Sequence, residues 1–380
     1  MSESQPQDDQ GLDLGADELD EETLARAKRG TRILLVLAAV FVVAIAISLT
    51  LLYWPDDKKQ TEEVPDEVAP SRVAPSSIEL PKVLFRDVSV ERGLKFKHQN
   101  GAQGRKLLPE TMGAGAAFFD YDGDGDPDLF LVNSAHWNPS LDDQSSRPAL
   151  YRNDGGTFVD VSEEQGFTTS FYGMGVAAAD YDEDGDPDLF VTAVGQNHLF
   201  RNDGGKGFAE VTQVSGCGGG NRWSTGAAFL DFDGDGHLDL FVCNYVVWSS
   251  EIDLKQGFKI DGTTRSYGPP RSFRGETCQL LRNLGDGKFE DVTGTAGVDV
   301  KNPATGEPMA KSLGLAVCDW NRDGHPDLII SNDTVQNFAF LNDGAGHFTE
   351  VGAEIGVAFD DKGNARGAMG LDVAAHRNDA

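Results

Sequence analysis

Short apolar runs and acidic turns alternate along most of the chain, from residue 83 to its end. Four runs of small and apolar residues, such as MGAGAAFF and YGMGVAAA, each precede an aspartate-rich turn that leads directly into a second apolar run, such as DLFLV. Apolar runs of this length, bounded by Gly, Asp and Pro, are typical of short β-strands. The pattern therefore predicts an all-β domain over residues 83–380.

A hairpin signal follows each pair of runs. The four segments are LYRNDGGTFVDVS from Leu150, LFRNDGGKGFAEVT from Leu199, LLRNLGDGKFEDVT from Leu280 and FLNDGAGHFTEVG from Phe340. Asn-Asp-Gly and related turns between β-rich runs favour tight hairpins. Each unit therefore contains about four short strands, as a propeller blade does. A lone F-x-D-V-S element at 85–89 matches the last strand of these units, and we expect it to complete the final blade of a ring.

The turns between the paired runs share one arrangement of oxygen-bearing residues. We call residues 120–128, 180–188, 231–239 and 319–327 loops 1 to 4. The predicted side-chain ligands at positions 1, 3, 5 and 9 are Asp120, Asp122, Asp124 and Asp128; Asp180, Asp182, Asp184 and Asp188; Asp231, Asp233, Asp235 and Asp239; and Asp319, Asn321, Asp323 and Asp327. Position 7 is expected to supply a backbone carbonyl, from Asp126, Asp186, His237 and His325.

This arrangement predicts calcium sites, about four in all. Calcium prefers six to eight hard oxygen ligands, and the glycine at position 6 permits the sharp turn. An EF-hand also begins D-x-D-x-D-G, but it needs a Glu at position 12 and a following helix. Here position 12 is Leu131, Val191, Val242 or Ile330, within a predicted strand. A metal-free acidic turn remains the alternative, which four copies in register disfavour.

The sequence resembles the FG-GAP/VCBS-repeat propellers of the cartilage acidic protein-like group, which often carry a C-terminal ASPIC/UnbV domain. The segments that carry the resemblance are FRDVSVERGLKFKHQNG, LPETMGAGAAFFDYDGDGDPDLFLVN, the repeated L-[YF]-R-N-D-G-x-F motif and CNYVVW. Together they span about residues 83–372. The resemblance implies an integrin-alpha-like β-propeller, calcium at the loops named above, and a secreted or cell-surface location.

The repeat pattern decays near the C-terminal end. In MGLDVAAHRNDA, Ala375 and Arg377 stand where the first two loop aspartates are expected. About four complete blades and partial ones are therefore predicted, and no ASPIC/UnbV-like segment follows them. We expect a C-terminally truncated form of such a propeller; a five-bladed ring and a ring completed by a second molecule are the alternatives.

A single membrane span is predicted ahead of the repeats. Residues 33–53 carry no charge, and at 1.5 Å per residue this length reaches about 31 Å, enough to cross a bilayer. Basic residues precede the span within an acidic tail, 1–32, which places the N-terminus in the cytoplasm. Five prolines among acidic residues make 55–82 an extended linker. We therefore expect segment 33–54 to anchor an extracellular or periplasmic propeller in a bacterial envelope; a cleaved signal peptide is the rival.

An insertion over 244–277 separates loop 3 from its hairpin. It carries aromatic and basic residues on what is expected to be one face of the propeller, and such loops often bind ligands. The candidate ligand surface is Tyr245, Trp248, Tyr267 and Arg271, with packing of these rings onto the blade as the alternative. Cys243 and Cys278 bracket the insertion and could form a disulfide, with buried free thiols as the alternative. The four cysteines allow three complete pairings, and spacing selects none of them.

The composition limits the functional classes. The formal net charge is −30, from 62 acidic and 32 basic residues, which argues against nucleic acid as a partner. No motif of a nucleophile, a base or a phosphate-binding loop is present, so we expect no enzyme. The preferred interpretation is a binding or adhesion module for a protein or a glycan. A structural envelope protein and, less favoured, a carbohydrate-active enzyme are the alternatives.

Overall fold

The computed structural model describes Arg29 and residues 84–137 and 146–374. The chain divides into two compact parts, Met1–Leu84 and Phe85–Ala380. The predicted membrane span, 33–54, lies outside the described residues, as do most of the tail and the linker. Among the residues that are described, no helix is long and apolar enough to cross a membrane.

The part from Phe85 is all-β, as the sequence pattern predicts, and its strands form four antiparallel units, here called blades 1 to 4. Blade 1 contains β1 (Ala116–Phe119), β2 (Asp128–Leu131), β3 (Ala149–Asn153) and β4 (Phe158–Asp160). Blade 2 contains β5 (Gly173–Ala179), β6 (Asp188–Gly195), β7 (His198–Asn202) and β8 (Phe208–Glu210). Blade 3 contains β9 (Arg222–Leu230), β10 (Asp239–Asn244), β11 (Gln279–Asn283) and β12 (Phe289–Asp291). Blade 4 contains β13 (Ser312–Cys318), β14 (Asp327–Asn332), β15 (Phe338–Asn342) and β16 (Phe348–Glu350).

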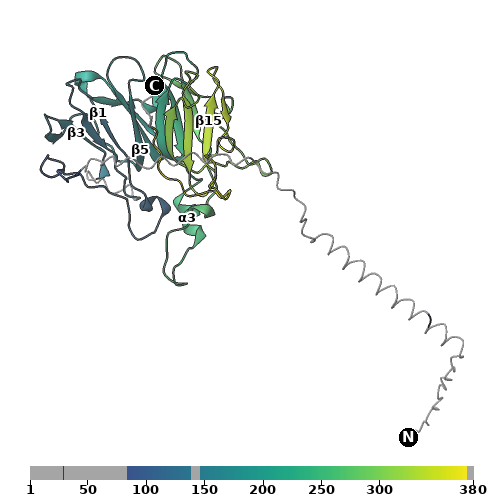
Figure 1. Cartoon of the computed structure of the whole chain (residues 1–380). Helices are drawn as coiled ribbons and strands as arrows, with labels where there is room; N and C mark the ends of the chain where they lie inside the picture. Colours follow the sequence, from purple (N-terminus) through teal and green to yellow (C-terminus); the bar gives the residue numbers. More distant parts are fainter. Residues whose placement is uncertain (1–28, 30–83, 138–145, 375–380) are drawn as a thin grey trace, which may run out of the picture. The chain divides into compact units, whose positions relative to one another are not determined.

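Few helical residues join these strands. The described helices are α2 (Thr212–Ser215) and α3 (Ser250–Gln256), with 3-10 turns η1 (Leu108–Thr111), η3 (Gly204–Lys206) and η4 (Pro270–Ser272). Helix α3 begins at Ser249, whose side chain accepts a hydrogen bond from the Ile252 amide, the usual arrangement of an N-cap. It belongs to the insertion and lies beyond one end of the strands (Figure 1).

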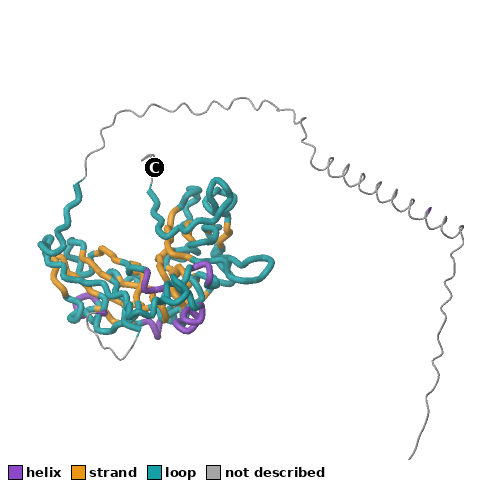
Figure 2. Tube along the Cα trace, turned by 90° about the horizontal axis from the view of Figure 1, so that it is seen from below, coloured by secondary structure: helices purple, strands orange, loops and turns teal. Residues whose placement is uncertain are grey.

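The hydrophobic cores lie between neighbouring blades. One cluster joins Phe130 and Leu150 of blade 1 to Leu189 and Phe200 of blade 2. Equivalent clusters join blade 2 to blade 3 and blade 3 to blade 4. Blades that bury their faces against each other form a propeller-like arrangement, and Figure 2 shows the strands following one another along an arc. Blades 2 and 3 are also paired directly, through Val194 with Trp223 and Gly195 with Arg222.

Glycines explain the small-residue runs that open each blade. A Cβ atom placed on Gly115 would lie 3.1 Å from the Cα of Gly175. A Cβ atom on Gly175 would lie only 2.6 Å from the carbonyl oxygen of Thr225. A residue with a side chain would therefore push these segments apart, and glycine lets the backbones of neighbouring blades come into contact.

The segment before blade 1 repeats the end of a blade without forming a described strand. Asp87 accepts hydrogen bonds from the amide and hydroxyl of Ser89, as Asp160 does from Ser162. Phe85 is 94% exposed, however, whereas its equivalents Phe208, Phe289 and Phe348 are buried. The match that the sequence predicts is thus visible in the turn, but 85–89 pair with no strand among the described residues.

Candidate metal centres

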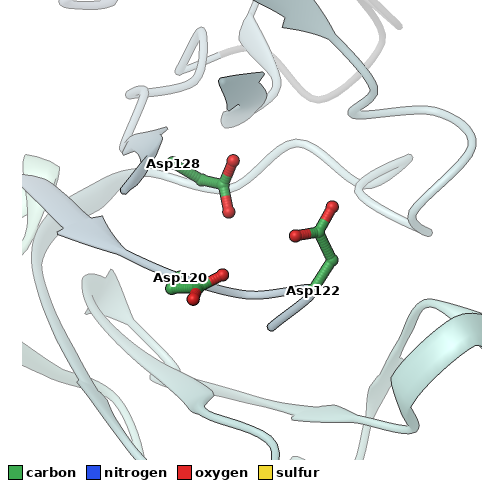
Figure 3. A group of neighbouring side chains, drawn as sticks. All are labelled: Asp120, Asp122 and Asp128. Carbon is green, nitrogen blue, oxygen red and sulfur yellow. The ribbon is translucent and has the colours of Figure 1, made fainter. Parts of the chain in front are cut away.

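Three of the four loops bring three carboxylates together. In each, one oxygen from positions 1, 3 and 9 lies within 4.8 Å of the other two. The groups are Asp120, Asp122 and Asp128; Asp180, Asp182 and Asp188; and Asp231, Asp233 and Asp239. Figure 3 shows the carboxylates of the first group turned toward a common space. Each cluster can therefore hold a metal ion, at residues that the sequence predicts.

Backbone amides build the turn around the first and fifth positions. Asp120 accepts hydrogen bonds from the amides of Asp124 and Gly125, at 3.1 and 2.9 Å. Asp124 accepts one from the amide of Asp126, at 2.8 Å. Gly125 has a φ of 90°, which L-residues rarely adopt. The structure thus places position 5 outside the three-carboxylate groups, although it lies in the same turn.

The carboxylate at position 9 is the buried centre of each loop. Asp128, Asp188, Asp239 and Asp327 have no exposed surface. Burial raises the pKa of Asp188 to about 7, opposed by amide hydrogen bonds from Asn202 and Tyr181 and reinforced by the carboxylates of Asp182 and Asp184. The same balance raises the pKa of Asp239 to about 7. Each loop therefore holds a charge that a cation would stabilise.

The donor set fits calcium. Every clustered ligand atom is a carboxylate oxygen, the type that calcium prefers. In loop 2, Oδ1 of Asp182 is buried without a hydrogen-bond partner among the described residues. A buried carboxylate oxygen without a donor is costly, and a cation would satisfy it. The residues present are thus suited to a hard divalent ion.

Loop 4 differs in charge. Asn321 occupies position 3, and its Nδ2 donates a hydrogen bond to Asp323, at 2.7 Å. In the other three loops, burial and neighbouring carboxylates raise the pKa of the position-3 aspartate. A nearby arginine lowers that pKa to a smaller extent. These arginines are Arg152, Arg201 and Arg282, and Leu341 takes the equivalent place in blade 4. Counted over positions 1, 3, 5 and 9 and this arginine alone, loop 4 therefore lacks one negative and one positive charge, and the sum of these charges is the same for all four loops.

One asparagine in each hairpin has a role that the sequence analysis missed. Asn153, Asn202, Asn283 and Asn342 each donate a backbone hydrogen bond to the position-9 carboxylate of their own blade. The pattern Asn-Asp-Gly indicates a tight turn and does not by itself predict this contact. The available clue was that Asn stays at the end of the third strand even where the following Asp is replaced by Leu284.

The candidate ligand surface is only partly exposed. Tyr245 is completely buried, and it does not belong to a surface, because it packs against Trp223 and Phe273. Trp248 is half-buried and donates its indole N–H to Asp253, at 2.9 Å. Tyr267 is half-buried beneath Lys106, whose Nζ lies 5.1 Å from the ring centroid. Arg271 is exposed. Packing therefore accounts for Tyr245, and the other three lie at or near the surface of the insertion.

The two cysteines that bracket the insertion lie next to each other. Val242 of β10 pairs with Gln279 of β11, so the next position along places Cys243 opposite Cys278, and the two thiols are in contact. Both are buried, and both are free thiols in this structure. The disulfide remains a prediction.

Comparison with known proteins supports the repeat assignment. Residues 120–191 and 182–242 match the model of the FG-GAP-like repeat. The chain is 28% identical to cartilage acidic protein 1 of Xenopus tropicalis over 210 residues, which are 53% of this chain and 27% of that protein. The chain thus matches about a quarter of the length of this relative. The predicted FG-GAP repeats and the similarity to the cartilage acidic protein-like group are confirmed.

Two solved structures were also matched, at low similarity. One is a lectin of Agrocybe aegerita that recognises non-reducing terminal N-acetylglucosamine, with 17% identity, a TM-score of 0.33, and coverage of 61% of this chain and 49% of the lectin. The other is a complex of BBS1N with ARL6DN soaked with lead, with 11% identity, a TM-score of 0.34, and coverage of 63% and 55%. Scores at this level carry no argument about function.

Proposed function

We propose that this chain of FG-GAP-like repeats is a calcium-binding, propeller-like binding module, displayed outside the cell on a single membrane anchor. The observation that supports it most is the recurrence of one oxygen cage in loops 1 to 3, with a buried carboxylate at position 9. Calcium would neutralise the clustered carboxylates. The chain's own residues hold the loop in shape through the amides that bind positions 1 and 5.

The proposed ligands are the side chains at positions 1, 3, 5 and 9 and the carbonyl at position 7. Loop 4 keeps oxygen atoms at each of these positions, because Asn321 offers a carbonyl oxygen. We therefore expect it to bind as well. Extracellular calcium is present at millimolar concentration, the range in which extracellular calcium modules bind. An external location, which segment 33–54 favours, is consistent with such sites.

Two surfaces fit the proposed ligand classes. A cavity of about 430 Å³ lies beside the segment that joins blades 2 and 3, lined by Gln196, Thr212, Gln213, Gly216, Gly218, Gly219, Gly220 and Asn221. This lining has no charged side chain, and amides pair well with the hydroxyl groups of a neutral glycan. The insertion instead exposes Ile260, at 78%, and Leu254, at 41%, which suit a protein partner.

Calcium titration of the full chain tests the first half of the proposal. We expect saturable binding by calorimetry and a higher melting temperature in calcium than in EDTA. Asp184→Asn should reduce both effects, whereas Glu163→Gln, an exposed acid outside the loops, should leave them unchanged. Equal melting in calcium and EDTA would remove the calcium function.

Capture experiments with immobilised glycans and with surface proteins test the second half. If Gln196→Ala loses glycan capture and Gln336→Ala, at the equivalent turn of blade 4, keeps it, the cavity is the glycan-binding site. Loss of protein capture in Ile260→Glu, but not in Val214→Glu, assigns the insertion; Val214 is 71% exposed and lies outside it. No capture by either route would favour a structural envelope protein.

A further inference from the structure

A continuous path of hydrogen bonds joins the loops of neighbouring blades. Within loop 1, the amide of Tyr121 donates to Asp128, at 3.0 Å. The carbonyl of Tyr121 accepts from Nδ2 of Asn202 in blade 2, at 2.8 Å. The amide of Asn202 donates to Asp188, the position-9 carboxylate of loop 2, also at 2.8 Å. Two residues thus connect the buried carboxylates of loops 1 and 2.

The same path recurs at the next two joints. Between loops 2 and 3, Tyr181 donates to Asp188 at 3.0 Å, Asn283 donates to the Tyr181 carbonyl at 2.8 Å, and the Asn283 amide donates to Asp239 at 2.8 Å. Between loops 3 and 4, the partners are Phe232, Asn342 and Asp327, with Asn342 donating to the Phe232 carbonyl at 2.9 Å. The path therefore runs without a break from Asp128 to Asp327.

These joints are shielded from water. Asn202, Asn283 and Asn342 are at most 2% exposed, so their hydrogen bonds have no solvent competitor and are costly to break. The aromatic ring at position 2 of each loop also packs on a phenylalanine of the next blade: Tyr121 on Phe208, Tyr181 on Phe289 and Phe232 on Phe348, with ring centroids 6.1, 5.7 and 6.1 Å apart. A loop and the neighbouring hairpin are thus held together by the same residue.

We propose that Asn202, Asn283 and Asn342 are positioning residues that couple cation binding in neighbouring loops. This inference rests on the calcium function proposed above. Ordering of loop 1 fixes Tyr121, and Tyr121 then fixes the side chain of Asn202 beside Asp188. Binding in one loop therefore meets part of the conformational cost of ordering the next. The coupling is reciprocal, because each loop must affect its neighbour by the same factor.

Asn153 provides a control within the chain. Its Nδ2 donates to the carbonyl of Pro127 in its own blade, at 2.9 Å, and its backbone amide holds Asp128. Unlike its three equivalents, it donates to no loop of another blade among the described residues. Asn153→Ala therefore removes the side-chain hydrogen bond within the blade, keeps the backbone bond to Asp128 and leaves every joint intact.

Trp320 allows loop 4 to be observed alone. It occupies position 2 of this loop, where the other loops carry Tyr121, Tyr181 and Phe232. Trp137, Trp223 and Trp248 lie together in the aromatic cluster beside the insertion. Terbium is a luminescent substitute for calcium, and its emission excited through Trp320 reports the occupancy of loop 4.

The test is a double-mutant cycle on the full chain, with terbium as the probe. Asp235→Asn weakens loop 3 without changing its shape, and Asn342→Ala removes the joint to loop 4. We expect Asp235→Asn to weaken terbium binding at loop 4 about fivefold or more, and to change it less than about twofold when Asn342→Ala is present. Asn153→Ala should leave the effect of Asp235→Asn intact.

The outcomes separate this inference from the function on which it rests. An unchanged loop 4 affinity in Asp235→Asn, or the same loss with and without Asn342→Ala, overturns the coupling but not the metal sites. The absence of Trp320-excited emission from the parent chain overturns both. Should Asn342→Ala fail to fold, Asp124→Asn in loop 1 decides: coupling through joints requires a smaller effect on loop 4 from this distant loop than from loop 3.

Discussion

The hydroxyl of Tyr245 donates a hydrogen bond to Oδ2 of Asp333, at 2.6 Å, across 88 positions of sequence. Tyr245 is completely buried and Asp333 is 5% exposed. Burial lowers the pKa of the Lys311 ammonium group, and the negative charge of Asp333 partly offsets this by raising it. The start of the insertion is therefore fastened to blade 4 by a buried polar contact.

Removal of that hydroxyl should destabilise the fold. Tyr245→Phe leaves the Asp333 carboxylate buried with one donor fewer, at a cost of about 1–3 kcal/mol. Denaturant unfolding would measure it, with Tyr151→Phe as the control, because Tyr151 only accepts a long hydrogen bond from the Lys95 amide, at 3.4 Å. Equal stabilities of the two variants would show that the Tyr245 contact contributes little.

A disulfide should form between Cys243 and Cys278 on oxidation. The two thiols face each other and Cys278 also lies 3.1 Å from Ser312 Oγ. Burial raises the pKa of the Cys243 thiol, whereas a hydrogen bond from Cys243 lowers that of Cys278, so Cys278 should supply the thiolate. Closing this loop should stabilise the fold by about 3–4 kcal/mol.

Labelling of thiols in denaturant would measure this reaction. On oxidation, the number of reactive thiols should fall from four to two in the parent chain and from three to one in Cys217→Ser. It should not fall in Cys243→Ser. Persistence of all four reactive thiols after oxidation would contradict the pairing.

The glycine at position 6 should be needed for backbone geometry alone. Gly185 has a φ of 97°, and a Cβ atom there would meet nothing within 4 Å. Gly185→Ala should thus cost about 1–2 kcal/mol, the strain of an L-residue in this region. Gly205→Ala offers a matched control in the same blade, since its Cβ atom would also meet nothing within 4 Å and its φ is ordinary. A control variant as unstable as Gly185→Ala would refute the explanation by strain.

The charge balance of loop 4 should determine its affinity for calcium. Leu341→Arg adds the positive charge that the other loops carry, without the aspartate that accompanies it. Binding at loop 4 should weaken about tenfold, the scale expected for one charge several ångströms from a divalent ion near the surface. Adding Asn321→Asp should restore it. Trp320-excited terbium titrations would follow all three chains, and failure of the second substitution to rescue the first would exclude charge balance as the cause.

The sequence was sufficient where the relevant contacts are local. The carboxylates of Asp120, Asp122 and Asp128 converge because alternate residues of one short turn face one centre, and spacing reveals that directly. The hairpins and the all-β architecture follow from apolar runs and turn residues of the same kind.

Contacts between distant residues were beyond such reasoning. Tyr245 is buried against Trp223 and Phe273 and bonded to Asp333 of blade 4, and nothing near it in the chain distinguishes it from an exposed aromatic residue. Glu183 of loop 2 and His237 of loop 3 provide a second example, because Nδ1 of His237 lies 2.7 Å from the Glu183 carboxylate. The side chain of Asn283 likewise finds its acceptor in another blade. Only the packing of one repeat against the next creates these partners.

The glycines where neighbouring blades meet also govern curvature. Gly175 touches the Thr225 backbone so closely that no side chain fits between them. Close spacing where the first strands of neighbouring blades meet favours a larger angle between these blades. A methyl group at Gly115 or Gly175 would push the first strands of neighbouring blades apart and should reduce the angle between those blades. The missing carbon atom at these two glycines thus favours a tighter curve of the repeats.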